Sequence, residues 1–137
     1  QAAESVLRDV LALREKYRWK DEPFIAAAIT SLAKVLEHRG DHLGADPLFE
    51  EALELRRRLL DPQQIAHSLS DYGESLLERG DLERAEPLLR EHCALRLQVW
   101  GADDWSVAGA QSLLGRCLAG QGRFAEAFAS SDQASDR

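Results

Sequence analysis

Apolar residues recur at helical spacing in three separate stretches of the chain. Between residues 25 and 36 they fall at intervals of four, three and four, which places them on one face of an α-helix. The pattern returns forty residues later and again from residue 107, where Gln111 is the one polar intruder. The three sets are Ile25, Ile29, Leu32 and Leu36; Ile65, Leu69, Tyr72 and Leu76; and Val107, Gln111, Leu114 and Leu118. This pattern predicts three similar helices, each with one buried face.

A glycine follows each of these predicted helices. Gly40 and Gly80 are 40 residues apart, and Gly122 comes 42 residues after Gly80. Glycine readily adopts the left-handed conformation that ends a helix, so each glycine predicts a tight turn. Apolar residues at helical spacing resume after each of the first two turns and predict a second, longer helix. A fixed period of this size indicates stacked helix hairpins.

The starts of the helices carry their own signals. Asp21 precedes Pro23 and Asp61 precedes Pro62, as expected for an acidic N-cap before a proline in the first turn. We expect about seven helices in a single domain covering 1–137. Its parts are a leading helix at 3–20 and repeats at 23–60, 61–102 and 103–137, the last with a frayed polar tail.

Small residues stand at matching offsets from the turn glycines. Ala33, Gly73 and Gly115 lie seven residues before them, and Ala45, Ala85 and Ala127 lie five residues after. In this respect the chain resembles the tetratricopeptide repeat family over about 24–130, and its long unit resembles the kinesin light chain type. Residues 85–127 carry the resemblance best, and they are also similar to arrays in the C-terminal regions of bacterial serine/threonine kinases. The resemblance implies an all-α, right-handed solenoid that binds a peptide or protein in a concave groove, within a larger signalling or scaffold protein.

The residues expected to face this groove lie opposite the buried stripe of each first helix. They are Thr30, Ser31, Lys34 and His38; His67, Ser70, Asp71 and Glu74; and Ser112 and Arg116. Lys34, Glu74 and Arg116 form a ladder of alternating sign, which suits a partner carrying both charges. The alternative is that these three pair with one another across adjacent helices. The Asn that often lies nine residues before the turn glycine in light-chain-type repeats is replaced by Ser31, Asp71 and Leu113, which leaves the ligand undefined.

Composition excludes several classes of function. The 17 Lys and Arg residues against 24 Asp and Glu give a net charge of −7, whereas a nucleic-acid partner requires a basic surface. No apolar run approaches the roughly 20 residues of a membrane span. No nucleophile and base set, phosphate-binding loop or metal-binding spacing is present, so we expect neither an enzyme nor a cofactor. The two cysteines favour a reducing compartment, and we expect a soluble, cytoplasmic segment of a longer, bacterial protein.

Some residues admit a second interpretation. Phe124 and Phe128 lie on the last predicted helix, which has no following repeat to cover it, and they favour self-association or an intramolecular regulatory arm. His92 stands where the first repeat has Ala52, and we expect it to pack at a helix contact. Trp19, Trp100 and Trp105 are expected to cover the junctions between repeats.

Overall fold

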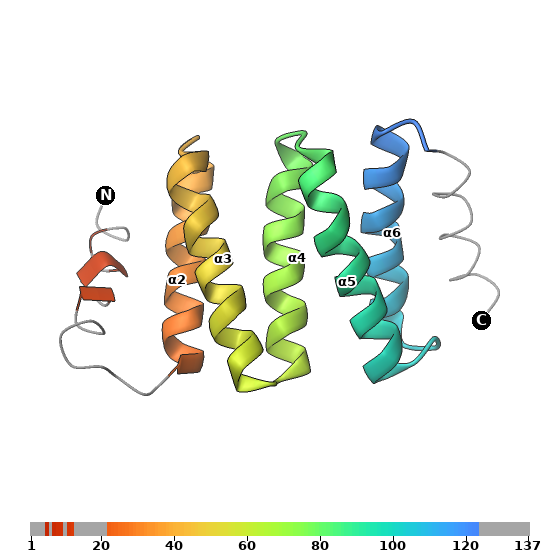
Figure 1. Ribbon diagram of the computed structural model, residues 1–137, viewed down its shortest axis with the longest axis horizontal. Coiled ribbons are helices and arrows are strands. Elements are labelled where there is room, and N and C mark those ends of the chain that lie inside the picture. The colour runs from red at the N-terminus through yellow and green to blue at the C-terminus, as the bar shows by residue number, and fades with distance from the viewer. Residues whose placement is uncertain (1–4, 6, 10, 13–21, 124–137) are drawn as a thin grey trace. The chain divides into compact units, whose positions relative to one another are not determined.

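The computed structural model describes residues 5, 7–9, 11–12 and 22–123. All regular secondary structure in these residues is helical, which confirms the predicted all-α class. Five helices have defined bounds (Figure 1): α2 (Glu22–His38), α3 (His42–Leu59), α4 (Pro62–Glu78), α5 (Leu82–Trp100) and α6 (Trp105–Gly120). Residues 5, 7–9 and 11–12, within the predicted leading helix, are also helical. The predicted last helix lies outside the described residues.

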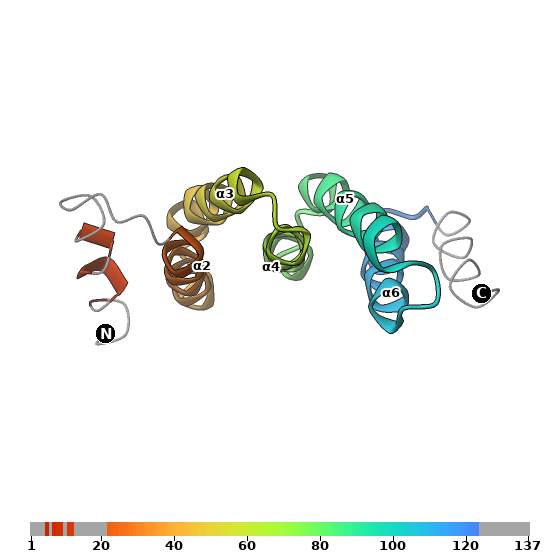
Figure 2. The same cartoon turned by 90° about the horizontal axis from the view of Figure 1, so that it is seen from below.

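The chain divides into two compact units, residues 1–68 and 69–137, with the boundary inside α4. In the first unit α2 and α3 lie side by side as a hairpin (Figures 1 and 2). The predicted stripe of α2 is buried as expected, and Ile25 and Ile29 pack with Ala52 and Leu55 of α3.

The turn after each first helix has the conformation that its glycine predicts. Gly40, Gly80 and Gly122 have φ of +83°, +82° and +78°, in the left-handed region that is strained for other residues. After the first turn, Asp41 caps α3 by accepting a hydrogen bond from the Gly44 backbone N–H at 2.9 Å. Asp81 occupies the same position before α5 but makes no such bond.

The second unit places α4 close to α5. Gly73 of α4 is buried, and a Cβ atom at this position would lie only 2.7 Å from Leu89 Cδ2 of α5. The helix contact therefore favours the small residue predicted at this site, because a larger one would force Leu89 to move. His92 is also buried, as expected, and its Nε2 accepts a hydrogen bond from Arg96 Nε at 3.2 Å.

The packing of α5 against α6 is anchored at the end of α6 (Figure 1). Glu86 of α5 accepts hydrogen bonds from Gln121 Nε2 at 3.0 Å and from Arg123 Nη1 at 2.6 Å. The Cys117 thiol is buried and donates to the Leu82 carbonyl at 3.3 Å. Cys93 and Cys117 are both free, and burial raises the pKa of each thiol, which disfavours the thiolate form. Cys117 is buried, whereas Cys93 is only partly buried.

The tryptophans correct one expectation. Trp105 is 85% exposed, so the prediction that it covers a junction between repeats is wrong. It is the first residue of α6, and the first buried residue of this helix is Val107. Trp100, at the end of α5, is partly buried and lies under the Arg96 guanidinium, 4.9 Å from the ring centroid. Trp19 lies outside the described residues.

Candidate functional site

The candidate surface in the first unit lies on the side of α2 away from its buried stripe. Ser31, Lys34 and His38 are exposed there. The stripe that begins with Ile25 and Ile29 is buried, which fixes the orientation of the helix. This surface of α2 therefore offers one ammonium group, one hydroxyl and one imidazole, and His67 exposes a second imidazole near the start of α4. The His67 ring is held by Gln63 one turn earlier, with 3.0 Å between Nε2 of each side chain.

Thr30 does not belong to this exposed set. The side chain is only 6% exposed, and its hydroxyl donates to the Ala26 carbonyl of the same helix at 2.9 Å. The expectation that Thr30 presents a hydroxyl on the surface is wrong. Threonine in a helix commonly satisfies its hydroxyl in this way, and neither spacing nor composition distinguishes such a residue from an exposed one.

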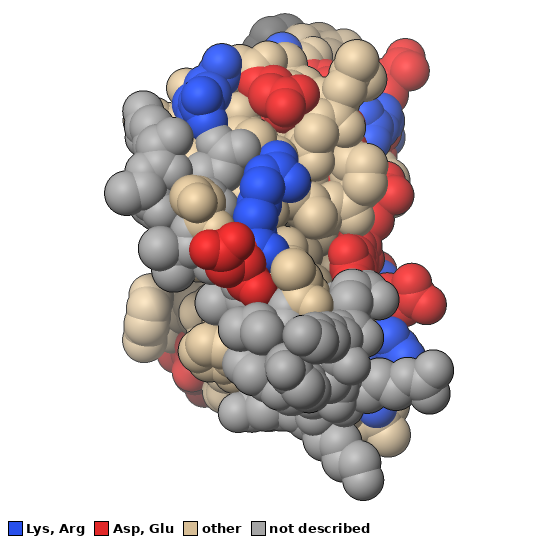
Figure 3. All heavy atoms as spheres, turned by 90° about the vertical axis from the view of Figure 1, so that its left-hand side faces the viewer, with Lys and Arg blue, Asp and Glu red and all other residues tan. Residues whose placement is uncertain are grey.

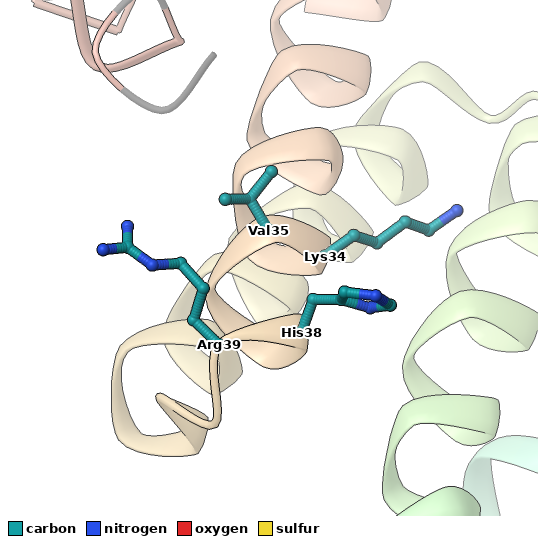
Figure 4. Close-up of a pocket in the computed structure, with 4 residues that line it drawn as sticks. All are labelled: Lys34, Val35, His38 and Arg39. Atoms are coloured by element: carbon teal, nitrogen blue, oxygen red, sulfur yellow. The ribbon is translucent and has the colours of Figure 1, made fainter. Parts of the chain in front are cut away.

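A cavity of about 300 Å³ lies beside α2 and is lined by Lys34, Val35, His38 and Arg39. In Figure 4, Lys34 and His38 point to one side of the helix, and Val35 and Arg39 point to the other side. Sequence reasoning found Lys34 and His38 but missed Val35 and Arg39. Both lie next to the buried stripe, where the helical pattern alone does not decide between core and surface.

The side chains that line this cavity offer hydrogen-bond donors and one apolar surface. Ammonium, imidazole and guanidinium groups can donate hydrogen bonds to carboxylates or to peptide carbonyls, and the Val35 side chain offers apolar contact. Among the described residues that line it, none carries a hydroxyl or a thiol. Within the described residues, no three His, Cys, Asp or Glu side chains come together as a metal site.

In the second unit the predicted residues differ in exposure. Ser112 and Arg116 are exposed on α6, one turn apart. Ser70, Asp71 and Glu74 of α4 are only partly exposed. The α6 pair is therefore the more accessible part of the candidate surface in this unit.

The surface charge is mixed. On the face shown in Figure 3, basic and acidic side chains lie among one another, and neither sign covers the described part of that face. A uniformly basic surface, which nucleic-acid binding would require, is not seen there. None of the described helices combines the length and the apolar character needed to cross a membrane.

Comparison with known proteins agrees with this architecture. Two family models, each described as tetratricopeptide repeat, match residues 24–98 and residues 108–129. Comparison with curated proteins gave no match.

Solved structures of similar fold include kinesin light chain nearly identical TPR-like repeats from Podosopora anserina, with a TM-score of 0.80 and 21% identity. That match covers 96% of this chain and 63% of the other. A point variant of the same protein gives a TM-score of 0.81 at 20% identity, with the same coverage. BtubC (BKLC) from P. vanneervenii gives 0.75 at 18% identity, over 97% of this chain and 53% of the other.

The chain thus spans less than two thirds of the length of these similar structures. At such identities the likeness concerns the fold, which confirms the repeat type inferred from the 40-residue period. Repeats of this family typically serve protein–protein interaction. Because the first family model covers more than half of the sequence, the chain belongs to the tetratricopeptide repeat family.

Proposed function

We propose that this chain is a non-catalytic module that binds a peptide or partner protein along its first helices, as part of a larger signalling or scaffold protein. The cavity beside α2 is the observation that carries this proposal. It is lined by two groups that donate hydrogen bonds, Lys34 and His38, and by the apolar Val35, and its volume of about 300 Å³ is large enough for a side chain of a partner. The same proposal places the module in the cytoplasm, in line with its two free thiols.

The partner segment should carry both signs of charge. Lys34 and Arg116 are exposed cations that favour carboxylates in the partner. Asp71 and Glu74 are partly exposed anions that disfavour a purely acidic segment. Ser31 in the first unit and Ser112 in the second are small and exposed, so a peptide backbone can approach each of these helices closely. The second unit alone carries both signs, in Asp71, Glu74 and Arg116, and an extended or helical segment with both charges fits it.

Peptides selected from a random display library on the intact chain test this proposal. The dissociation constant of the best peptide is measured for the wild type and for the Lys34→Glu and Arg116→Glu variants. We expect each substitution to weaken binding several-fold, while circular dichroism retains the helical signal.

Arg58→Glu is the matched control, because Arg58 is exposed on α3, a second helix, and the substitution changes charge by the same amount. If Arg58→Glu weakens binding as much as the other two, the effect is one of net charge. The proposed surface is then incorrect, as it is if none of the three substitutions weakens binding.

The alternative of self-association rests on Phe124 and Phe128, which lie outside the described residues. Sedimentation over a range of concentrations tests it, and a strict monomer at high concentration would exclude it.

A further inference from the structure

Trp105 is the most exposed aromatic side chain among the described residues. At 85% exposure it leaves nearly its whole indole ring in solvent, whereas Trp side chains are highly buried on average. It therefore adds little to the packing of its own unit. Tryptophan is also one of the residue types enriched among the side chains that dominate binding energy at protein interfaces. Its exposure thus calls for an explanation outside the unit.

The ring is displayed from an ordered turn. Asp104 caps α6, and its Oδ1 accepts hydrogen bonds from the Ser106 backbone N–H at 2.8 Å and from the Ser106 hydroxyl. These bonds fix the first turn of α6, so this turn would lose little backbone entropy when a partner binds to the ring. One turn further, Ala108 and Gly109 are exposed, and a Cβ atom at Gly109 would meet nothing within 4 Å. A partner side chain has free space along this side of α6.

Two carboxylates precede the ring. Asp103 is exposed, and no hydrogen bond or ion pair involves it within the described part of the chain. The bonds from Ser106 hold the pKa of Asp104 below its usual range, so this carboxylate is charged at neutral pH. Both of those bonds use Oδ1, which leaves Oδ2 for another donor. An anionic ligand is disfavoured here, because the start of α6 already carries a carboxylate as its cap.

Another tryptophan of the same unit, Trp100, already makes a cation–π contact. The Arg96 guanidinium lies 4.9 Å from the centroid of the Trp100 ring. Trp100 thus contacts a cation of its own helix, whereas no cation from the described residues lies over Trp105. A guanidinium or ammonium group is attracted by the face of an indole ring and by neighbouring carboxylates together.

We propose that Trp105, Asp103 and Asp104 form a docking point for an arginine or lysine side chain of a partner protein. This inference builds on the proposed function, since it assumes a protein partner, and it specifies the chemistry at one end of α6. The net charge of −7 attracts a basic segment at long range, and the ring with its two carboxylates then selects the cationic side chain.

An acetylated, amidated hexa-arginine peptide is the probe. Its binding is followed by NMR through the indole N–H resonance of Trp105, which a Trp105→Phe variant assigns. We expect this resonance to shift saturably with hexa-arginine and to stay in place with hexa-glutamate. Asp103→Asn should weaken binding by up to about five-fold, as expected for the loss of one exposed ion pair.

Glu83→Gln is the matched control, because it removes one exposed carboxylate from α5 in the same unit. A Trp105 resonance that does not respond would refute the inference. Equal weakening by Glu83→Gln and Asp103→Asn would refute it too, because general attraction to the net charge would then explain binding. If the library peptide binds along the first helices and the Trp105 resonance does not shift with hexa-arginine, this inference is wrong and the proposed function stands. If Trp105 responds but Lys34→Glu and Arg116→Glu leave the library peptide unaffected, only the proposed function fails.

Discussion

The contact between Gly73 and Leu89 gives the sharpest test of the helix packing. Leu89 is fully buried, so its side chain has little room to turn away from a new atom 2.7 Å distant. Gly109 provides the comparison, because it is also inside a helix but faces open space. The same substitution should therefore stabilise the protein at Gly109 and fail to stabilise it at Gly73.

The magnitudes follow from two opposing effects. Replacing glycine by alanine inside a helix stabilises by about 0.8–1 kcal/mol, and Gly109→Ala should show this gain undiminished. Overpacking costs about 1–3 kcal/mol, so Gly73→Ala should be neutral to destabilising by about 2 kcal/mol. Gly73→Leu adds three further carbons at the same contact and should lose about 1–3 kcal/mol.

Urea unfolding followed by circular dichroism at 222 nm measures these differences, with the slope checked for each variant. A double-mutant cycle identifies the cause. In a Leu89→Ala background the clash is removed, so Gly73→Ala should become stabilising by about 1 kcal/mol, like Gly109→Ala. A gain from Gly73→Ala in the wild type equal to that from Gly109→Ala would refute the close approach of α4 and α5.

Two further predictions concern the polar contacts. The pKa of Glu86 is lowered, first by its hydrogen bond from Arg90 and then by that from Gln121. The stability that Glu86 contributes is therefore fully present above its unfolded pKa of about 4.3, and it is lost as the pH falls through the lower pKa of the folded state. Glu86→Gln should flatten this part of the stability profile in urea titrations below pH 4.5 or so, and an unchanged profile would contradict the assignment. Asp41→Ala should lower the midpoint of thermal unfolding by the equivalent of about 1 kcal/mol, because it removes a cap bond. Asp81→Ala removes no cap bond and should cost less, so equal losses would count against the capping difference.

The periodic parts of the fold were predictable from the sequence. The stripe on α2 is buried, and Gly40, Gly80 and Gly122 adopt the positive φ that their turns require. These features depend on local backbone geometry, which repeats with the sequence. Gln111 shows the same regularity, because it is buried at the position its repeat assigns to it, despite being polar.

The candidate surface was predictable only in part. Helical spacing placed Ser31, Lys34 and Arg116 on exposed faces correctly. It failed for Thr30, because a hydroxyl bonded to its own helix can be buried at little cost, and spacing does not report that bond. It also failed for Trp105, because size and apolarity suggested a packing role that its place at the helix start does not permit.

Arg56, near the end of α3, is 6% exposed, and its Nη1 donates to the Ser68 hydroxyl of α4 at 2.9 Å. This bond joins the second helix of one repeat to the first helix of the next. A chain cut between α3 and α4 would uncover a guanidinium that is sheltered in the intact protein. Deletion, duplication or grafting of repeats should therefore succeed more often with breakpoints after residue 68 than at the turn near residue 60, although this turn separates the two repeats in the sequence.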